Sequence, residues 1–331
     1  MSLLSNLLGR RPQPPGGDDA PQVRQVLGEE LEPALRLILG GTAGKCGDAT
    51  LLDFLNYAVH RHIDLYEARA LVAGGMVRWA ALPIVSPGRT ALLLCPGKTP
   101  ADSLHQGARD VLEACCHNVA LAGCQIAQVL LEPSASAVES LLNDAGFSSL
   151  TKLVYLKLQR TRAMPADLPA GLRLLPYAPE RHAAFTEAIE QSYIASQDCP
   201  ELNGKRTMED VLASHRAAGA FDPERWRVLM EGDKPLGVSL CAALADGRSC
   251  ELVYLGVSAA ARGRRLGQVL LRSAIQDAYE RDQTSMSLAV DARNVPALKL
   301  YWRHGFVRSH ERVALLRDLR QTQSGSTPTS A

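Results

Sequence analysis

The feature that most constrains the fold of this chain is an internal repeat. The segment LLNDAGF, which ends at Phe147, resembles LYWRHGF, which ends at Phe306, and the offset between them is 306 − 147 = 159. Gly88-Arg89 recurs as Gly247-Arg248 at the same offset, and no gap is needed between these anchors. Self-similarity at a fixed offset indicates that one structural plan is used twice. We therefore expect both halves of the chain to have the same fold.

The length of the chain agrees with two domains. It has 331 residues, and domains usually contain about 100–200. We predict a disordered arm at 1–20, a first domain at 21–160, a linker at 161–171, a second domain at 172–320 and a disordered tail at 321–331. Pro165 and Pro169 disfavour regular structure in the linker, and the tail QTQSGSTPTSA is small and polar.

The hydrophobic pattern predicts the same order of elements in each half. A helical region is followed by a β-hairpin, a strand, a helix, a strand, a helix that ends at Gly-Phe, and a last strand. In the second half we expect strands at Leu252–Val257 and Ser287–Val290. Helices should follow each of them, from Gly267 to about Arg281 and from Pro296 to about His304.

Composition excludes several classes of function. The net charge is +1, so we expect no nucleic-acid partner and no acidic membrane surface. No run of 18 apolar residues is present, and we expect no membrane span. The eight cysteines form no C-x-x-C pair and no cluster with histidine at ligand spacing. We therefore expect free thiols, a cytoplasmic location and no bound metal.

The segment ELVYLGVSAAARGRRLGQVLLRSAI joins a buried strand to a helix through a turn rich in glycine and arginine. The first N–H groups of a helix lack intrahelical partners and attract anions, and glycine allows close approach of the main chain. The run from Arg262 to Gly267 therefore suits a pyrophosphate. The alternative is an ordinary basic surface turn. Neither a P-loop nor a Rossmann fingerprint is present.

A second block, SLAVDARNVPALKLYWRHGF, places Asn294 just before a helix and Tyr301 on it. Each residue has a structural alternative, because Asn294 is also a suitable helix cap and Tyr301 a suitable core aromatic. The two blocks in this order are more specific than either block alone.

Because it contains both blocks in this order, the second half resembles the GNAT superfamily of N-acetyltransferases. The family's Q/R-x-x-G-x-G/A run corresponds to residues 262–267, with Arg265 in place of the first glycine. The family's later block corresponds without exception to Asn294, Ala297, Leu300, Tyr301, Gly305 and Phe306. The resemblance implies an α/β (α+β) protein with two tandem acyl-CoA N-acyltransferase folds. Each would be a mixed, mostly antiparallel sheet flanked by helices and splayed between its fourth and fifth strands.

The resemblance also implies roles for individual residues. The main chain of Leu255 and Val257 would bind the thioester carbonyl and the pantetheine amides of acetyl-CoA, and Asn294 would contact the CoA arm. Tyr301 would be the general acid, and Glu251 resembles the base of some members. The pyrophosphate would lie on Arg262, Gly263, Arg264, Arg265, Leu266 and Gly267. Weaker base candidates are His215, Asp198 and Glu201, and Glu251 has the alternative of an exposed strand-end carboxylate.

The repeat tests whether the first half can act in the same way. At the repeat offset, Tyr301 corresponds to Leu142, Asn294 to Ala135 and Glu251 to Leu92. Leucine cannot donate a proton and alanine cannot bind an amide. We therefore expect a degenerate first domain with a structural role, as in tandem members of the family with one working half.

These features predict an enzyme that moves an acetyl group from acetyl-CoA to an amine by direct transfer. The acceptor would be a small-molecule or peptide amine, and the protein a monomer or homodimer. The alternative is a non-catalytic acyl-CoA-binding regulatory module, which the departure at Arg265 keeps open.

Overall fold

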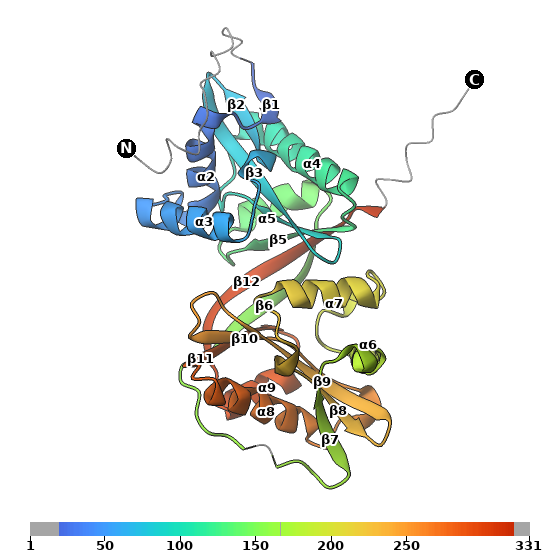
Figure 1. Cartoon of the computed structure of the whole chain (residues 1–331). Helices are drawn as coiled ribbons and strands as arrows, with labels where there is room; N and C mark the ends of the chain where they lie inside the picture. Colours follow the sequence, from blue (N-terminus) through green and yellow to red (C-terminus); the bar gives the residue numbers. More distant parts are fainter. Residues whose placement is uncertain (1–19, 166, 321–331) are drawn as a thin grey trace, which may run out of the picture. The chain divides into compact units, whose positions relative to one another are not determined.

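A computed structural model describes residues 20–165 and 167–320 (Figure 1). The predicted arm, apart from Ala20, and the predicted tail lie outside these ranges. The described residues form two compact units. The first contains the chain up to Leu150 and again from Val313 on, and the second contains Thr151–Arg312. In the second unit, residue 166 lies in the linker and is not described.

The sheet of the second unit has six strands in the order β7-β8-β9-β10-β11-β6. Neighbouring strands are antiparallel, except that β10 and β11 are parallel. Their bounds are β6 (Ser148–Leu158), β7 (Leu172–Pro176), β8 (Trp226–Glu231), β9 (Lys234–Ala243), β10 (Ser249–Val257) and β11 (Ser285–Asp291).

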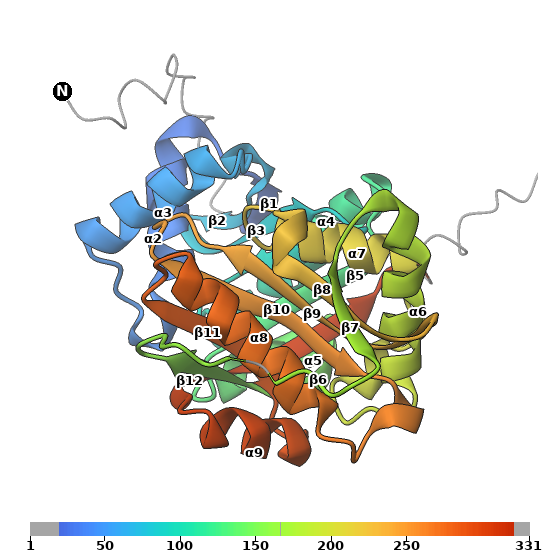
Figure 2. The same ribbon diagram turned by 60° about the horizontal axis from the view of Figure 1, so that its bottom comes forward.

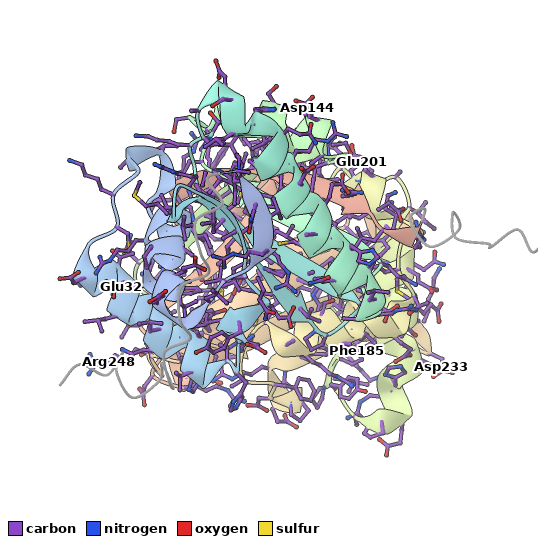
Figure 3. All side chains as sticks on the ribbon, turned by 90° about the horizontal axis from the view of Figure 1, so that it is seen from above. Glu32, Asp144, Phe185, Glu201, Asp233 and Arg248 are labelled. Atoms are coloured by element: carbon purple, nitrogen blue, oxygen red, sulfur yellow. The ribbon has the colours of Figure 1, made fainter. Side chains whose placement is uncertain are left out.

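Helices cover both faces of this sheet. On one face α6 (His182–Tyr193) and α7 (Met208–Ala217) enclose a core that contains Phe185, labelled in Figure 3, and Trp226. On the other face α8 (Leu266–Glu280), which lies across the strands in Figure 2, and α9 (Val295–Arg303) pack on Leu252 and Leu288. The strands and helices predicted for this half are thus confirmed, each to within two residues at its first and last position, except that β10 begins three residues earlier.

The first unit repeats this plan. Its helices are α2 (Leu31–Leu39), α3 (Asp48–His60), α4 (His105–Leu121) and α5 (Ser136–Asp144). Its strands β1 to β5 pair in sequence order, antiparallel apart from the parallel pair β4–β5. Their bounds are β1 (Gln22–Gln25), β2 (Arg69–Ala73), β3 (Met76–Ser86), β4 (Thr90–Leu94) and β5 (Ile126–Leu131).

The registers of the two parallel pairs coincide at the repeat offset. Thr90 pairs with Ile126 in the first unit and Ser249 with Ser285 in the second, and both residues of the pair are shifted by 159. In each of these two strand pairs, only three residues of one strand are paired with residues of the other. The predicted fold class, with two mixed and mostly antiparallel sheets flanked by helices, is therefore confirmed.

The last strands of the two halves are exchanged. The strand β6 ends the first half of the sequence but pairs with β11 in the second unit. The strand β12 (Val307–Asp318) ends the second half, and its residues Val313–Asp318 pair with β5 in the first unit. The division by contacts therefore differs from the predicted sequential boundaries. Residues 151–160 belong with the second unit and residues 313–320 with the first.

Candidate active site

A cavity opens where β10 and β11 separate. The two strands pair only from Ser249 to Glu251 and from Ser285 to Ser287, and a bulge distorts β10 between Leu252 and Tyr254. The cavity has a volume of about 280 Å³. Six residues that the sequence assigned to the site line it together, namely Leu255, Val257, Arg262, Gly267, Asn294 and Tyr301.

The β11-facing main-chain groups of β10 beyond Glu251 have no strand partner, because β11 has diverged. Main-chain N–H and C=O groups rarely stay without hydrogen-bond partners away from water. The side chains of Leu255 and Val257 pack toward α8, so these residues can offer main-chain groups to the cavity. Such an edge suits a ligand that carries amides.

The start of α8 suits an anion. Arg265 is the residue before the helix and has a left-handed conformation, with φ 62° and ψ 19°. No side chain caps the helix, and its first turn contains no acidic residue. Gly263 also has a positive φ, of 80°, while Leu266 is buried and fixes the loop to the core. The first N–H groups of α8 are therefore available to a phosphate group.

Two of the three arginines of this loop have partners within the protein. Arg262 donates to the main-chain oxygens of Ser192 and Ala195 at 2.7 and 3.0 Å. Arg264 forms an ion pair with Glu231, with 2.6 Å between Nη2 and Oε1. The sequence placed all three arginines in the run predicted to hold the pyrophosphate and gave no sign of these protein partners. The side chain of Arg265 is exposed.

Tyr301 lies on α9, where it packs on Phe306 and lines the cavity. Only 6% of its surface is exposed. Burial raises the pKa of Tyr301 well above its ordinary value, and the charge of Asp198 adds to this effect. Its hydroxyl therefore keeps its proton at neutral pH and is able to donate it.

Asn294 has the position of a helix cap as well as a place in the cavity wall. Its side-chain oxygen accepts from the main-chain N–H of Ala297 at 3.3 Å. Asp198, a second polar residue in the cavity, accepts from the main-chain N–H of Asp291 at 3.1 Å. Burial raises the pKa of Asp198, although hydrogen bonds from Asp291 and Asn294 oppose the shift. Asn294 thus caps α9 and lines the cavity at the same time.

A buried acid at the end of β11 holds the loop after α6. Asp291 accepts from the Thr151 hydroxyl at 2.7 Å and from the Cys199 main chain at 3.0 Å. Arg293 bridges Asp291 and Glu201, which is labelled in Figure 3. Burial alone would raise the pKa of Asp291, but these hydrogen bonds, those from Arg293 above all, lower it to about 2. Sequence reasoning missed this network, whose signal was the DAR segment directly before Asn294.

Glu251 does not line the cavity and faces the α6–α7 side of the sheet. Its neighbour Leu252 packs with α8, and successive strand residues face opposite sides. Burial raises the pKa of Glu251. The register places Ser287 beside it on β11.

The weaker base candidates lie in different surroundings. His215 packs against Tyr254 with 5.3 Å between ring centroids, and burial lowers the pKa of His215 to about 4. The Glu201 carboxylate binds Arg293. Of the three candidates, Asp198 is the one that lines the cavity.

The first unit has no polar side chain at two of the positions that correspond to this site. At the positions of Tyr301 and Asn294 it has the buried Leu142 and Ala135. Gly97 stands at the position of Gly256, and the main chain of Gly41 would lie 2.5 Å from an added Cβ there. Glu132 stands at the position of Asp291 and accepts from the Thr42 hydroxyl. The loop after α2 is therefore fixed close against the ends of β4 and β5, after which Gly97 and Glu132 lie.

Two further properties of the described residues bear on the site. Within 20–165 and 167–320, no group of three or more His, Cys, Asp or Glu side chains is arranged to hold a metal ion. No helix in the same ranges is both long and apolar enough to cross a membrane.

Both units have the fold of GCN5-related N-acetyltransferases. The structure superposes on such a protein from Sphaerobacter thermophilus with a TM-score of 0.62, 21% identity, and coverage of 91% of this chain and 96% of that chain. A fungal glucosamine N-acetyltransferase region gives a TM-score of 0.55 at 12% identity, over 91% of this chain and 38% of that chain. These similarities establish the fold alone.

Residues 189–306 match the model of the acetyltransferase (GNAT) family, and this part of the chain is a domain of that family. Members of this family use acetyl-CoA as co-substrate. Among curated proteins, the chain is 32% identical over 149 residues to the mycothiol acetyltransferase of Beutenbergia cavernae, covering 43% of this chain and 48% of that protein. It is 31% identical over 172 residues to that of Thermobispora bispora, covering 50% and 57%. The chain thus spans about half the length of the curated relatives it matches. Its arrangement of two tandem units resembles that of mycothiol synthase.

Proposed function

We propose that this chain is an acetyl-CoA-dependent N-acetyltransferase and that its second unit transfers the acetyl group directly to an amine. The observation that supports it most is the cavity between β10 and β11. There the unpaired edge of β10 and the buried hydroxyl of Tyr301 lie together, beside the uncapped start of α8. Family membership of residues 189–306 supports the same reaction class.

In this proposal the main chain of Leu255 and Val257 binds the amide-bearing arm of the co-substrate, and Asn294 contacts it. Gly263, Leu266 and Gly267 bring the first N–H groups of α8 to the pyrophosphate. Arg265 adds an exposed positive charge, while Arg262 and Arg264 contribute less because they already have protein partners.

The bound co-substrate supplies an activated acetyl group. Glu251 accepts a proton from the ammonium form of the acceptor, directly or through water, because only the free amine is nucleophilic. Its raised pKa makes Glu251 a better proton acceptor than an exposed carboxylate. Tyr301 donates its hydroxyl proton to the departing sulfur.

We propose a small-molecule amine as the acceptor, ahead of a peptide amine. The curated relatives are mycothiol acetyltransferases, a name that refers to mycothiol and not to a peptide or protein. All eight cysteines are free thiols, which supports the proposed cytoplasmic location. A monomer or a homodimer is compatible with these roles.

The test combines calorimetric titration with acetyl-CoA and mass spectrometry of a panel of primary amines incubated with acetyl-CoA and protein. We expect one acetyl-CoA site per chain and acetylation of at least one amine. Two sites would contradict the degenerate first unit. Binding without any acetylated product would instead favour the non-catalytic regulatory module, for which the paired states of Arg262 and Arg264 are the supporting observation.

A further inference from the structure

We propose that Tyr155 forms the wall of the acceptor subsite opposite Glu251 and contacts the non-reacting part of the acceptor. This assignment rests on the proposed function and adds a specificity-determining residue to it. Tyr155 belongs to β6, so the residue comes from the first half of the sequence although it lies in the second unit.

The sheet register places Tyr155 on the face that carries Glu251. Leu252, Leu288 and Leu156 pack in one core with α8 and α9. Their strand neighbours must therefore face the opposite side. On that side Glu251 lies beside Ser287 of β11, and Ala289, two residues further along β11, lies beside Tyr155 of β6.

The residues of β11 that lie between Glu251 and Tyr155 on this face, Ser287 and Ala289, have small side chains. Ser287 is half-buried, and Ala289, which pairs with β6 but lies beyond the pairing with β10, is exposed. Ala289 also lines the cavity between β10 and β11. An acceptor that lies over Ala289 would therefore be next to Tyr155 and next to the cavity in which the acetyl group would be presented.

The wall formed by Tyr155 is held in place. Its ring stacks on that of His310, with 4.2 Å between centroids and 13° between planes. Burial, and then the charge of Glu251, raise the pKa of Tyr155, so its hydroxyl is neutral and its ring lies within electrostatic reach of that carboxylate. Burial also lowers the pKa of His310, and the stacked pair is uncharged at neutral pH. A fixed, neutral aromatic surface beside a carboxylate suits the body of a small ammonium compound.

The test is steady-state kinetics of acetyl transfer to L-cysteine, glucosamine, tyramine and spermidine, with calorimetric titration of each protein by acetyl-CoA. For the amines that wild type acetylates, we expect Tyr155→Ala to raise the acceptor KM about tenfold or more, equivalent to about 1.4 kcal/mol. The acetyl-CoA Kd should stay within twofold. His310→Ala should act in the same direction but more weakly, because it removes only the support of the ring.

Two further variants keep the test decisive. Tyr155→Phe retains the stacked ring in case Tyr155→Ala does not fold, and it should keep the acceptor KM within about threefold, or about 0.65 kcal/mol. Tyr279→Ala removes an exposed tyrosine from α8 and serves as the control. An unchanged acceptor KM in folded Tyr155→Ala and His310→Ala would overturn this assignment and leave the proposed function intact. Failure of wild type to acetylate any of the four amines would instead overturn the proposed function and this assignment with it.

Discussion

The Arg262 guanidinium donates to the main-chain oxygens of Ser192 and Ala195, at 2.7 and 3.0 Å. These oxygens belong to the last turn of α6 and to the residues that follow it, where carbonyl groups lack helical partners and carry partial negative charge. The same side chain lines the cavity. Arg262 therefore joins the cavity wall to the start of the loop after α6. Asp291 fixes the same loop further along the chain, at Cys199.

Arg262→Ala is accordingly expected to weaken acetyl-CoA binding more than Arg264→Ala. The first substitution removes two hydrogen bonds that hold the cavity wall, whereas Arg264 forms a surface ion pair with Glu231 that contributes little. Calorimetry should show a Kd raised about tenfold for Arg262→Ala and within about twofold for Arg264→Ala. Equal losses in the two variants would contradict this difference in role.

Tyr301→Phe is expected to lower kcat by about 100-fold, the usual contribution of a general acid. The acetyl-CoA Kd should not change, because the ring and its packing are retained. A general acid acts only while protonated, and burial raises the pKa of Tyr301. The alkaline limb of kcat in wild type should therefore lie above about pH 10, the ordinary tyrosine value. Tyr279→Phe is the control, and an equal fall in kcat there would remove the specific role of Tyr301.

Much of the fold could be predicted from the sequence because its signals are local or periodic. The apolar run Leu252–Val257 predicted a strand, Pro296 predicted the start of a helix, and both occur in the structure. The constant offset between the two halves predicted the shared plan, and the two parallel pairs obey it residue for residue.

The exchange of strands and the arginine partners could not be predicted in this way. An apolar strand such as β6 pairs equally well with either copy of a repeated sheet, so its pattern does not specify its neighbour. Ser192 lies 70 residues before Arg262, and Glu231 lies 33 residues before Arg264. Such contacts depend on the tertiary structure, which cannot be predicted from composition or from the spacing of motifs.

Arg265→Gly is expected to stabilise the protein. Arg265 has φ 62°, and a left-handed conformation is strained for a residue with a Cβ atom but not for glycine. We expect the free energy of unfolding in urea to rise by about 0.5 kcal/mol, since the greater freedom of glycine in the unfolded chain offsets part of the gain. Lys299→Gly, at an exposed helical position in α9, should instead lower it by about 1 kcal/mol. A loss of stability in Arg265→Gly would show that the arginine side chain outweighs the strain.

Asp291→Asn is expected to destabilise the protein in a pH-dependent manner. The pKa of this buried acid is about 2 in the folded protein and 3.8 in the reference state, and a lowered pKa stabilises the fold where the group is ionised. The contribution, about 2 kcal/mol, is complete above pH 4 and is lost as the pH falls toward 2. Urea unfolding of wild type and variant should therefore differ at pH 7, differ by about half as much at pH 3, and converge near pH 2. A difference that is constant over this range would assign the loss to packing.

The exchange of strands predicts that the second half of the sequence does not fold by itself. A chain of residues 161–331 lacks β6, which leaves β11 with an unpaired edge and removes Val154, Leu156 and Leu158 from the core of the second unit. Exposed edges and missing core side chains favour aggregation or a loosely packed state. We expect poor solubility and a weak near-ultraviolet circular dichroism signal from this chain.

A chain of residues 148–331 retains β6 and is the matched comparison. It should restore the pairing of β11, and with it more of the native tertiary signal, even though the end of β12 has lost β5 as its partner. The comparison isolates the segment 148–160, which supplies β6 and Tyr155. If residues 161–331 instead gave a soluble, cooperatively folded protein, the strand exchange would be dispensable, and the sequential boundary near residue 160 would describe the folding unit better than the contacts do.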